Sequence, residues 1–343
     1  MKHFILYMAI IFVTVFGGIA LTNYLIDPGH VYRSQKYIDK VIEGISQGYH
    51  VEGITDIDER QYKLRFAKLH EGESFDYLAL GSSRIMTVSK DILHGSTFLN
   101  LSISNSQIEE LVAFYQISKD LNIHYKTLLI TADPSFFNSH YLDDRWKSLG
   151  LYVNEFLGKE AAKQEIDWDL IRNLLSVSYF RIALKSFIAG NDTLNYVKTA
   201  KNDGETFHTD GSFFWSRAVY EAPQSVVDEK ARTCHYHLFK DFYDLSDERV
   251  ALFTKLVESI KADGVKIYFM CNPYHPIFYK NILKLQGVVE AIDFIETYAK
   301  DNNIPVIGSF NPADVGLDGS DFYDGPHVRK ECLDKIIEKG LFN

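Results

Sequence analysis

The chain has 343 residues, of which 46% are hydrophobic and 14% aromatic, so it can bury the core of one large domain or of two modest ones. Its formal net charge of −10 argues against a nucleic-acid partner and against a polybasic membrane-binding surface. The three cysteines are too sparse, and odd in number, to form a disulfide framework.

The N-terminus carries a long apolar run. Residues 4–26 contain no charged side chain, and a helix of this length rises about 34 Å, enough to cross the hydrocarbon core of a bilayer. We therefore predict a transmembrane anchor over residues 1–27 and one globular domain over residues 28–343. The alternative is a cleaved export signal, although the apolar core of such signals usually spans only about 7–15 residues.

The charges beside this run do not favour export of the domain. Lys2 precedes the run, whereas three basic residues follow it, Arg33, Lys36 and Lys40. Basic residues collect on the cytoplasmic side of a membrane. Charge alone therefore does not predict an extracytoplasmic domain.

Short apolar segments then alternate with segments of helical periodicity. Strands are predicted at residues 76–80, 98–103, 127–130, 266–270 and 305–307, and helices at residues 108–121, 249–262, 288–300 and 329–339. Such alternation is typical of a parallel sheet covered on both faces. The predicted fold class is α/β, with three α/β/α layers and a parallel five-stranded sheet.

Residues 135–245 do not follow this alternation and are rich in Tyr, Phe and Trp. We interpret them as a largely helical insertion, or a cap over the functional cleft. The aromatic side chains either stack on sugar rings or simply pack in a core.

Two short motifs at opposite ends of the domain predict the chemistry. Ser83 follows the first predicted strand in the sequence Gly81-Ser82-Ser83, and Asp324 and His327 stand shortly before the last helix. A serine nucleophile needs a base to take its proton, and the base needs an acid to orient it. Asp324 stands three residues before His327, so one turn can bring both into one crevice. The alternative reading of the serine motif is an ordinary strand-to-helix turn.

Other polar residues also follow predicted strands, where functional groups of parallel sheets collect. We predict a role in oxyanion or substrate binding for five of them: Ser82, Arg84, Asn105, Asp133 and His275. Arg84 either binds substrate, or orients Asp133 by a charge-assisted pair, or lies on a helix surface. His275 either lines the cleft or packs in its loop.

No metal and no cofactor is predicted. The sequence Cys234-His235-Tyr236-His237 contains ligand-type side chains. We do not expect these histidines to share a metal ion.

The two motifs resemble those of the SGNH (GDSL-type) hydrolase superfamily. That resemblance implies a flavodoxin-like fold and a Ser-His-Asp triad formed by Ser83, His327 and Asp324. Ser82 stands where the family usually has Asp, residues 104–106 (Ser-Asn-Ser) replace its Gly block, and Asp133 stands where it has an Asn donor. An ionised Asp cannot donate to an oxyanion. The hole would therefore use the backbone N–H of Ser83 and a donor from Asn105.

The segments 80–84, 100–104 and 272–276, behind one N-terminal anchor, resemble a narrower group of bacterial proteins. This group includes the D-alanyl transfer protein of teichoic-acid modification and the alginate acetylation proteins. The resemblance implies a membrane-anchored acyltransferase or acyl-relay subunit. It would act on an extracytoplasmic glycan with a polytopic membrane-bound O-acyltransferase as partner. The alternatives are an extracytoplasmic serine esterase and a catalytically silent glycan-binding subunit.

Overall fold

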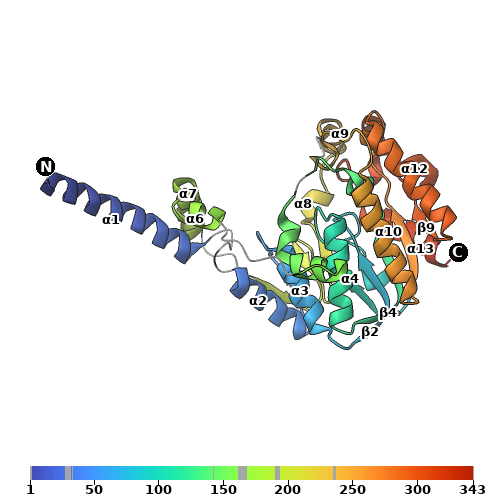
Figure 1. Cartoon of the computed structure of the whole chain (residues 1–343), viewed down its shortest axis with the longest axis horizontal. Coiled ribbons are helices and arrows are strands. Elements are labelled where there is room, and N and C mark those ends of the chain that lie inside the picture. The colour runs from blue at the N-terminus through green and yellow to red at the C-terminus, as the bar shows by residue number, and fades with distance from the viewer. Residues whose placement is uncertain are drawn as a thin grey trace.

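A five-stranded parallel sheet forms the centre of the globular part (Figure 1). In the computed structural model, which describes residues 2–27, 32, 34–141, 143–160, 168–189, 194–234 and 237–342, the strand order is β3-β2-β4-β8-β9. The bounds are Ser74–Leu80 (β2), Phe98–Asn100 (β3), His124–Thr131 (β4), Lys266–Cys271 (β8) and Val306–Gly308 (β9). All neighbouring pairs are parallel. The predicted α/β class and five-stranded parallel sheet are confirmed.

The strands are buried because successive side chains enter two different cores. Leu78 and Leu80 of β2 join the larger core, whereas Ala79 between them joins the smaller one. Leu128 and Leu129 of β4 divide in the same way. Burial on both faces explains why the strands read as continuous apolar runs.

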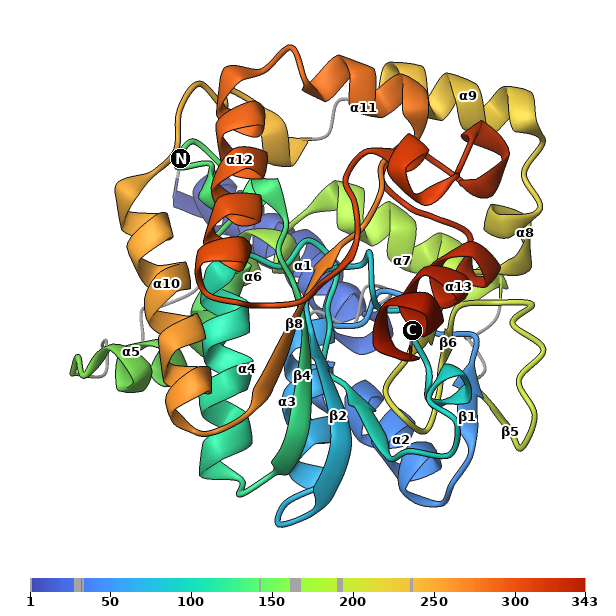
Figure 2. The same cartoon turned by 90° about the vertical axis from the view of Figure 1, so that its right-hand side faces the viewer.

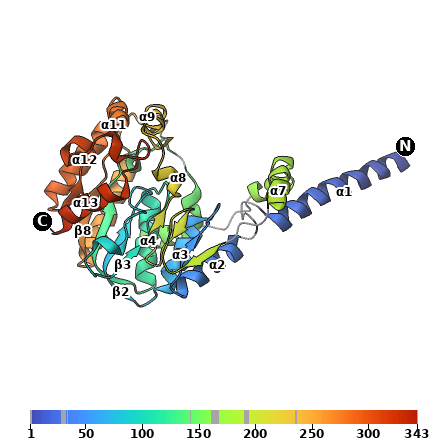
Figure 3. The same cartoon turned by 180° about the vertical axis from the view of Figure 1, so that it is seen from behind.

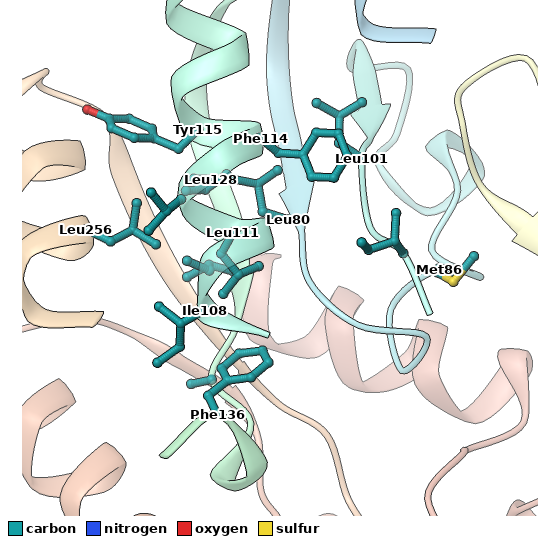
Figure 4. Packing of buried hydrophobic residues seen from close by; sticks show 14 of the residues in the cluster. Leu80, Met86, Leu101, Ile108, Leu111, Phe114, Tyr115, Leu128, Phe136 and Leu256 are labelled. Carbon is teal, nitrogen blue, oxygen red and sulfur yellow. The ribbon is translucent and has the colours of Figure 1, made fainter. Parts of the chain in front are cut away.

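Helices pack on both faces of this sheet (Figure 2). The larger core is shared with α2 (Ser34–Ser46), α3 (Glu59–Leu69), α4 (Ile108–Asp120), α5 (Gly150–Leu157), α10 (Asp247–Ala262) and α12 (Gln286–Asp301). Figure 4 shows Leu80 and Leu128 against Leu111 and Phe114 of α4. The smaller core is closed by α13 (Lys330–Phe342).

Two predicted boundaries are corrected. The second strand was expected to reach residue 103 but ends at Asn100, whose Nδ2 donates to the carbonyl oxygens of Ile85 and Val88. Beyond Asn100 the chain still runs beside β2, since the Leu101 N–H donates to the Ala79 carbonyl oxygen at 2.9 Å. The last helix was expected to stop before Gly340 but continues to Phe342. A Cβ at Gly340 would lie 2.8 Å from Cγ1 of Ile307, so this glycine allows α13 to approach β9 rather than ending the helix.

The segment 135–245 contains more than helices. It includes α5, α6 (Trp168–Leu174), α7 (Val177–Ala189), α8 (Arg217–Tyr220) and α9 (Gln224–Thr233), and α11 (Pro276–Ile282) lies beyond it. It also supplies β5 (Asn195–Val197), β6 (Thr206–Phe207) and β7 (Phe213–Phe214), which form an antiparallel sheet with β1 (His50–Glu52) in the order β5-β1-β6-β7. This second sheet was not predicted, because strands of two or three residues are too short to show a period.

The N-terminal helix α1 (Lys2–Ile26) projects away from the sheet (Figures 1 and 3). Its segment His3–Ile26 is long and apolar enough to cross a membrane, and an 18-residue window of it has a mean hydropathy of 2.5 and contains no buried residue. The structure places α6 and α7 against this helix rather than over the sheet.

Candidate active site

The turn after β2 presents Ser83 at the carboxyl end of the sheet. Gly81 begins this turn, and a Cβ there would lie only 1.8 Å from Oγ1 of Thr131 on the neighbouring strand. Only glycine therefore lets β2 and β4 stay paired up to this point. The N–H groups of Ile85 and Met86 donate to the carbonyl oxygens of Ser82 (3.1 Å) and Ser83 (3.4 Å), which closes the turn.

Ser83, His327 and Asp324 form a continuous hydrogen-bonded chain. Ser83 Oγ lies 2.8 Å from His327 Nε2 across 244 residues of sequence. His327 Nδ1 lies 2.8 Å from Asp324 Oδ2 and 3.0 Å from Asp324 Oδ1. The expected separations of a serine, a base and an orienting acid are thus present. With Asp324 accepting from Nδ1–H, Nε2 is left free to accept the proton of Ser83.

The loop that carries His327 is held from several sides. The His327 backbone N–H donates to Asp324 Oδ1 at 2.9 Å, and the Tyr323 N–H donates to the His327 carbonyl oxygen at 3.3 Å. The rings of Tyr323 and His327 stack with centroids 5.3 Å apart and an interplanar angle of 3°. Two further residues, Phe322 and Val328, pair in a β-bridge. The imidazole is therefore oriented before any substrate arrives.

Ser83, His327 and Asp324 differ in their exposure to solvent. Ser83 is 6% exposed, whereas the side chains of His327 and Asp324 are 15% and 27% exposed. The nucleophile is thus nearly enclosed, while the acid end of the chain meets solvent.

Arg84 is buried behind the nucleophile and does not reach the cleft. Its Nη1 donates to Asp133 Oδ2 at 3.0 Å, and both side chains are 1% exposed. Its guanidinium lies 3.7 Å from the centroid of the Tyr274 ring, and the Tyr274 hydroxyl donates to Asp133 Oδ1 at 3.2 Å. The expected charge-assisted pair with Asp133 is present. The expectation that Arg84 and Asp133 touch substrate is not supported, because neither carboxylate nor guanidinium is exposed.

The same guanidinium connects the segment of Ser83 to the segment of His327. Arg84 Nε donates to the carbonyl oxygen of Pro326 at 3.2 Å, directly beside His327. Nη2 donates to the carbonyl oxygens of Asn272 and Pro273. The Asn272 side chain returns a hydrogen bond to the Arg84 carbonyl oxygen at 3.0 Å. Arg84 therefore fixes the turn of Ser83 relative to the loop of His327.

His275 packs within its loop and does not line the cleft, which decides between the two alternatives for this residue. Its side chain is 1% exposed; Nδ1 accepts from the Ile277 N–H at 3.2 Å, and Nε2 lies 3.4 Å from Asp228 Oδ1. Burial lowers the pKa of His275, while the Asp228 carboxylate acts in the opposite direction. Its backbone N–H donates to the Gly325 carbonyl oxygen at 2.8 Å, so this residue supports the catalytic loop from below.

The oxyanion donors remain partly a prediction. Among the described residues, none accepts a hydrogen bond from the backbone N–H of Ser83, so this donor is available. Asn105 is half-buried with a φ of 48°, in the loop between β3 and α4. This loop runs beside the nucleophile turn, since the Ile103 N–H donates to the Gly81 carbonyl oxygen at 3.0 Å. Ser82 is buried in the turn, where its Oγ accepts from the Arg84 N–H at 3.4 Å.

A cavity of about 690 Å³ lies beside the loop that carries His327 rather than over Ser83. Its wall includes Tyr220. The ring centroids of Tyr220 and Tyr323 are 5.0 Å apart, and the Tyr323 ring stacks on His327. His208 and Phe214 also line the cavity, and their rings stack with centroids 4.4 Å apart. Burial lowers the pKa of His208 to about 4, so this imidazole is neutral at pH 7.

Sequence reasoning missed the two tyrosines that support the site. Tyr323 directly precedes Asp324, and Tyr220 comes from the segment 135–245 more than 100 residues earlier. A single aromatic residue beside a motif carries no signal of its own in one sequence. Residues around α8 and α9 flank the loop that carries His327, whereas α6 and α7 pack against α1; a cap over the site stays a prediction.

Within the ranges that the structure describes, no group of three His, Cys, Asp or Glu side chains is arranged to hold a metal ion. His235 and Tyr236 of the Cys234–His237 segment lie outside the described residues. The three cysteines are free thiols.

No protein-family model matches this chain, and a search of curated proteins also finds no match. The function of the site must therefore be judged from its geometry and from the motifs alone.

Proposed function

We propose that this protein is a membrane-anchored serine acyltransferase, or the acyl-relay subunit of one, that acts on an extracytoplasmic glycan. The polytopic membrane-bound O-acyltransferase implied by the motif resemblance would supply the acyl group. The observation that carries the proposal is the chain of hydrogen bonds from Ser83 Oγ through His327 to Asp324.

The chemistry follows from that chain. His327 Nε2 takes the proton of Ser83 while Oγ attacks the acyl carbonyl carbon. The resulting oxyanion is stabilised by the Ser83 N–H and a donor from Asn105. As the intermediate collapses, His327 returns the proton to the leaving oxygen or sulfur, and an ester on Ser83 remains. An acceptor hydroxyl then attacks this ester and gives its proton to His327, which passes it to Ser83 Oγ as the bond between Oγ and the acyl carbon breaks.

Transfer to a glycan rather than to water requires that the acceptor be bound close to the ester. The cavity lined by Tyr220 could bind such an acceptor. The contacting rings of Tyr220 and Tyr323 separate it from His327, and its wall combines aromatic, charged and amide side chains. An esterase is the second candidate. It is favoured by the partial exposure of His327 and Asp324, which lets water approach the same ester.

The first test is labelling of purified full-length protein with a fluorophosphonate, which reacts with activated serines whatever their natural acyl group. We expect labelling of the unmodified protein and a loss of at least about 10³-fold in rate for Ser83→Ala and His327→Gln. Ser96→Ala is the control, because this serine precedes β3 at the opposite end of the sheet. Equal labelling of Ser83→Ala and Ser96→Ala would contradict the nucleophile assignment.

The acceptor is tested in cells of the source organism. Replacement of the native copy by Ser83→Ala should abolish ester groups on the envelope glycan while the protein remains folded and in the membrane. Normal glycan acylation in that strain would favour a catalytically silent subunit. The esterase would be favoured by a different result: fluorophosphonate labelling that is lost in Ser83→Ala, release of free acid by the unmodified protein, and no transfer of acyl groups to glycan.

A further inference from the structure

Two short helices from the middle of the chain pack against the end of the N-terminal helix. We call residues 168–189, which comprise α6 and α7, the α6–α7 hairpin. Figures 1 and 3 both show it beside the C-terminal part of α1 and apart from the central sheet. About 140 residues of sequence lie between α1 and this hairpin, so the contact is a property of the fold.

Buried polar side chains of α1 hold the hairpin in place. Asn23 is fully buried, and its Nδ2 donates to the carbonyl oxygens of Asn173 (3.2 Å), Leu174 (2.9 Å) and Ser176 (3.0 Å) at the turn between α6 and α7. The carbonyl oxygens of Asn173 and Ser176 also accept from the backbone N–H groups of Ser176 and Phe180, so the Asn23 amide adds to the hydrogen bonds of this turn. An asparagine in an otherwise apolar helix is costly unless it is bonded in this way.

A second contact lies one turn further along. Asp27 is buried, and its Oδ1 accepts from the Tyr179 hydroxyl at 2.8 Å. Ala183 of α7 is also fully buried, one helical turn after Tyr179. One face of α7 therefore packs against the end of α1, and its opposite face is exposed.

That outward face is unusually apolar. Outside α1, fifteen large apolar side chains of the described residues are exposed, and seven of them lie within residues 171–188. They are Ile171, Leu175, Val177, Ile182, Leu184, Phe187 (68% exposed) and Ile188 (83% exposed). Such clustering on a small element is not expected of a surface that faces water.

The charge of the hairpin is opposite to that of the whole chain. Residues 168–189 contain three basic side chains, Arg172, Arg181 and Lys185, and one acidic residue, Asp169. Arg181 and Lys185 are exposed on the outward part of α7, between the apolar side chains. Exposed apolar residues interleaved with basic ones are typical of helices that lie in a membrane interface, where lipid headgroups are often anionic.

We propose that the α6–α7 hairpin lies in the interface of the bilayer that α1 spans, with Phe187, Ile188 and their apolar neighbours in the headgroup and acyl-chain boundary. The position follows from α1, since Asn23 and Asp27 mark the end of its apolar span at about one bilayer thickness from Phe4. The occupant of the apolar face is thus an anionic lipid surface.

The hairpin then has a mechanical consequence. A single helix can rotate and tilt freely in a membrane, but a helix with a rigid hairpin at the interface presents a fixed side to the bilayer. The globular domain would be held in a limited range of orientations above the membrane. This inference goes beyond the proposed acyl transfer and does not depend on the catalytic residues.

The test measures depth in the bilayer and needs no activity. The full-length protein, with Cys234 and Cys332 replaced by Ser, is labelled with an environment-sensitive fluorophore at one introduced cysteine and reconstituted into vesicles of phosphatidylcholine and phosphatidylglycerol (3:1). The sites are Ile188→Cys in the hairpin, Phe12→Cys in the middle of α1, and Tyr243→Cys, which is exposed on the globular domain. Lipids with a quencher near the headgroup or deep in the acyl chain are then added to the vesicle composition.

We expect the label at position 188 to be quenched at least twofold more by shallow than by deep quenchers, the label at position 12 to show the reverse, and the label at position 243 to be quenched by neither. The proposal also predicts weaker quenching at position 188 when Phe187 is replaced by Glu or when phosphatidylglycerol is omitted. A label at position 188 that behaves like that at position 243 would overturn the proposal. An unquenched label at position 12 would also overturn it. So would a label at position 188 that becomes inaccessible to solvent only when native membranes are added, because the apolar face would then bind a protein.

Discussion

Lys63 of α3 is fully buried, and its Nζ donates to the carbonyl oxygens of Asn100 (2.8 Å) and Gly211 (2.5 Å). It also lies within 6 Å of the ring centroids of Tyr62 and Phe66. Together with Arg84, it shows that single buried cations join segments that are distant in sequence. Lys63 connects the end of β3 to the second sheet, and Arg84 connects the two catalytic loops.

Burial lowers the pKa of Lys63 to about 7, although Glu59 and Asp210 act in the opposite direction. The unfolded chain has the ordinary pKa of 10.5 and therefore binds more protons between pH 7 and 10.5, so the folded state gains stability as pH rises through this window. We expect Lys63→Met to remove this gain, worth about 4 kcal/mol between pH 6 and 10. Urea unfolding in detergent at several pH values measures it.

Lys68→Met is the matched control, since Lys68 is exposed on the same helix. It should leave the pH dependence unchanged. If the free energy of unfolding changes with pH in the same way for the unmodified protein and for Lys63→Met, Lys63 keeps its ordinary pKa in the folded state.

At the scale of elements, the site depends on how closely β2 and β4 run together where they end. The turn after β2 is constrained by Thr131, and the loop after β9 is constrained by its own hydrogen bonds and by the Tyr323 ring. Ser83, His327 and Asp324 thus lie in loops at the ends of the strands. Small changes in strand spacing should therefore reach Ser83 directly.

Gly81→Ala tests this dependence. Its Cβ would lie 1.8 Å from Thr131 Oγ1 and 2.8 Å from Ile85 Cδ1, so the turn must shift. We expect a loss of about 1–3 kcal/mol of stability and a fall of about 10²-fold in the rate of fluorophosphonate labelling at Ser83. Thermal unfolding and labelling kinetics measure the two effects.

Gly150→Ala serves as its control, because the nearest atom to its added Cβ is 3.9 Å away. Removing the Thr131 hydroxyl in Gly81→Ala/Thr131→Ala should restore part of the labelling rate. If Gly81→Ala reacts as fast as the unmodified protein, the turn does not control the position of the nucleophile.

At the scale of the whole molecule, three parts of one chain have different surroundings. The central α/β domain is packed around its own core, the second sheet extends that core beside the cavity, and α1 with the α6–α7 hairpin has an exposed apolar surface. The segment His3–Ile26 of α1 is long and apolar enough to cross a membrane. The extracytoplasmic position of the domain remains a prediction from the motif resemblance.

We expect the full-length protein to sediment with membranes, to resist alkaline carbonate, to dissolve only with detergent, and to keep its N-terminus. In spheroplasts the globular domain should be digested by added protease while a cytoplasmic marker stays intact. Recovery as a soluble protein that lacks residues 1–27 would identify a cleaved signal instead. Protection of the domain from protease would place it in the cytoplasm.

The sequence by itself determined the features that depend on local patterns. Apolar runs of four to six residues predicted four of the central strands to within a few residues, and the apolar N-terminal run predicted α1. The Gly81–Ser83 and Asp324–His327 motifs predicted the catalytic candidates, because each motif is short and stands next to a recognisable strand or helix.

Only the tertiary structure decided features that depend on contacts between distant segments. Burial of Arg84 is set by carbonyl groups more than 180 residues away, and residue type alone does not distinguish a buried arginine from a substrate-binding one. The second sheet joins β1 to strands about 150 residues later. The hairpin is attached to α1 by Asn23, whose partners lie 150 residues further on. Periodicity reports which side of an element is buried, but it does not report which other element buries it.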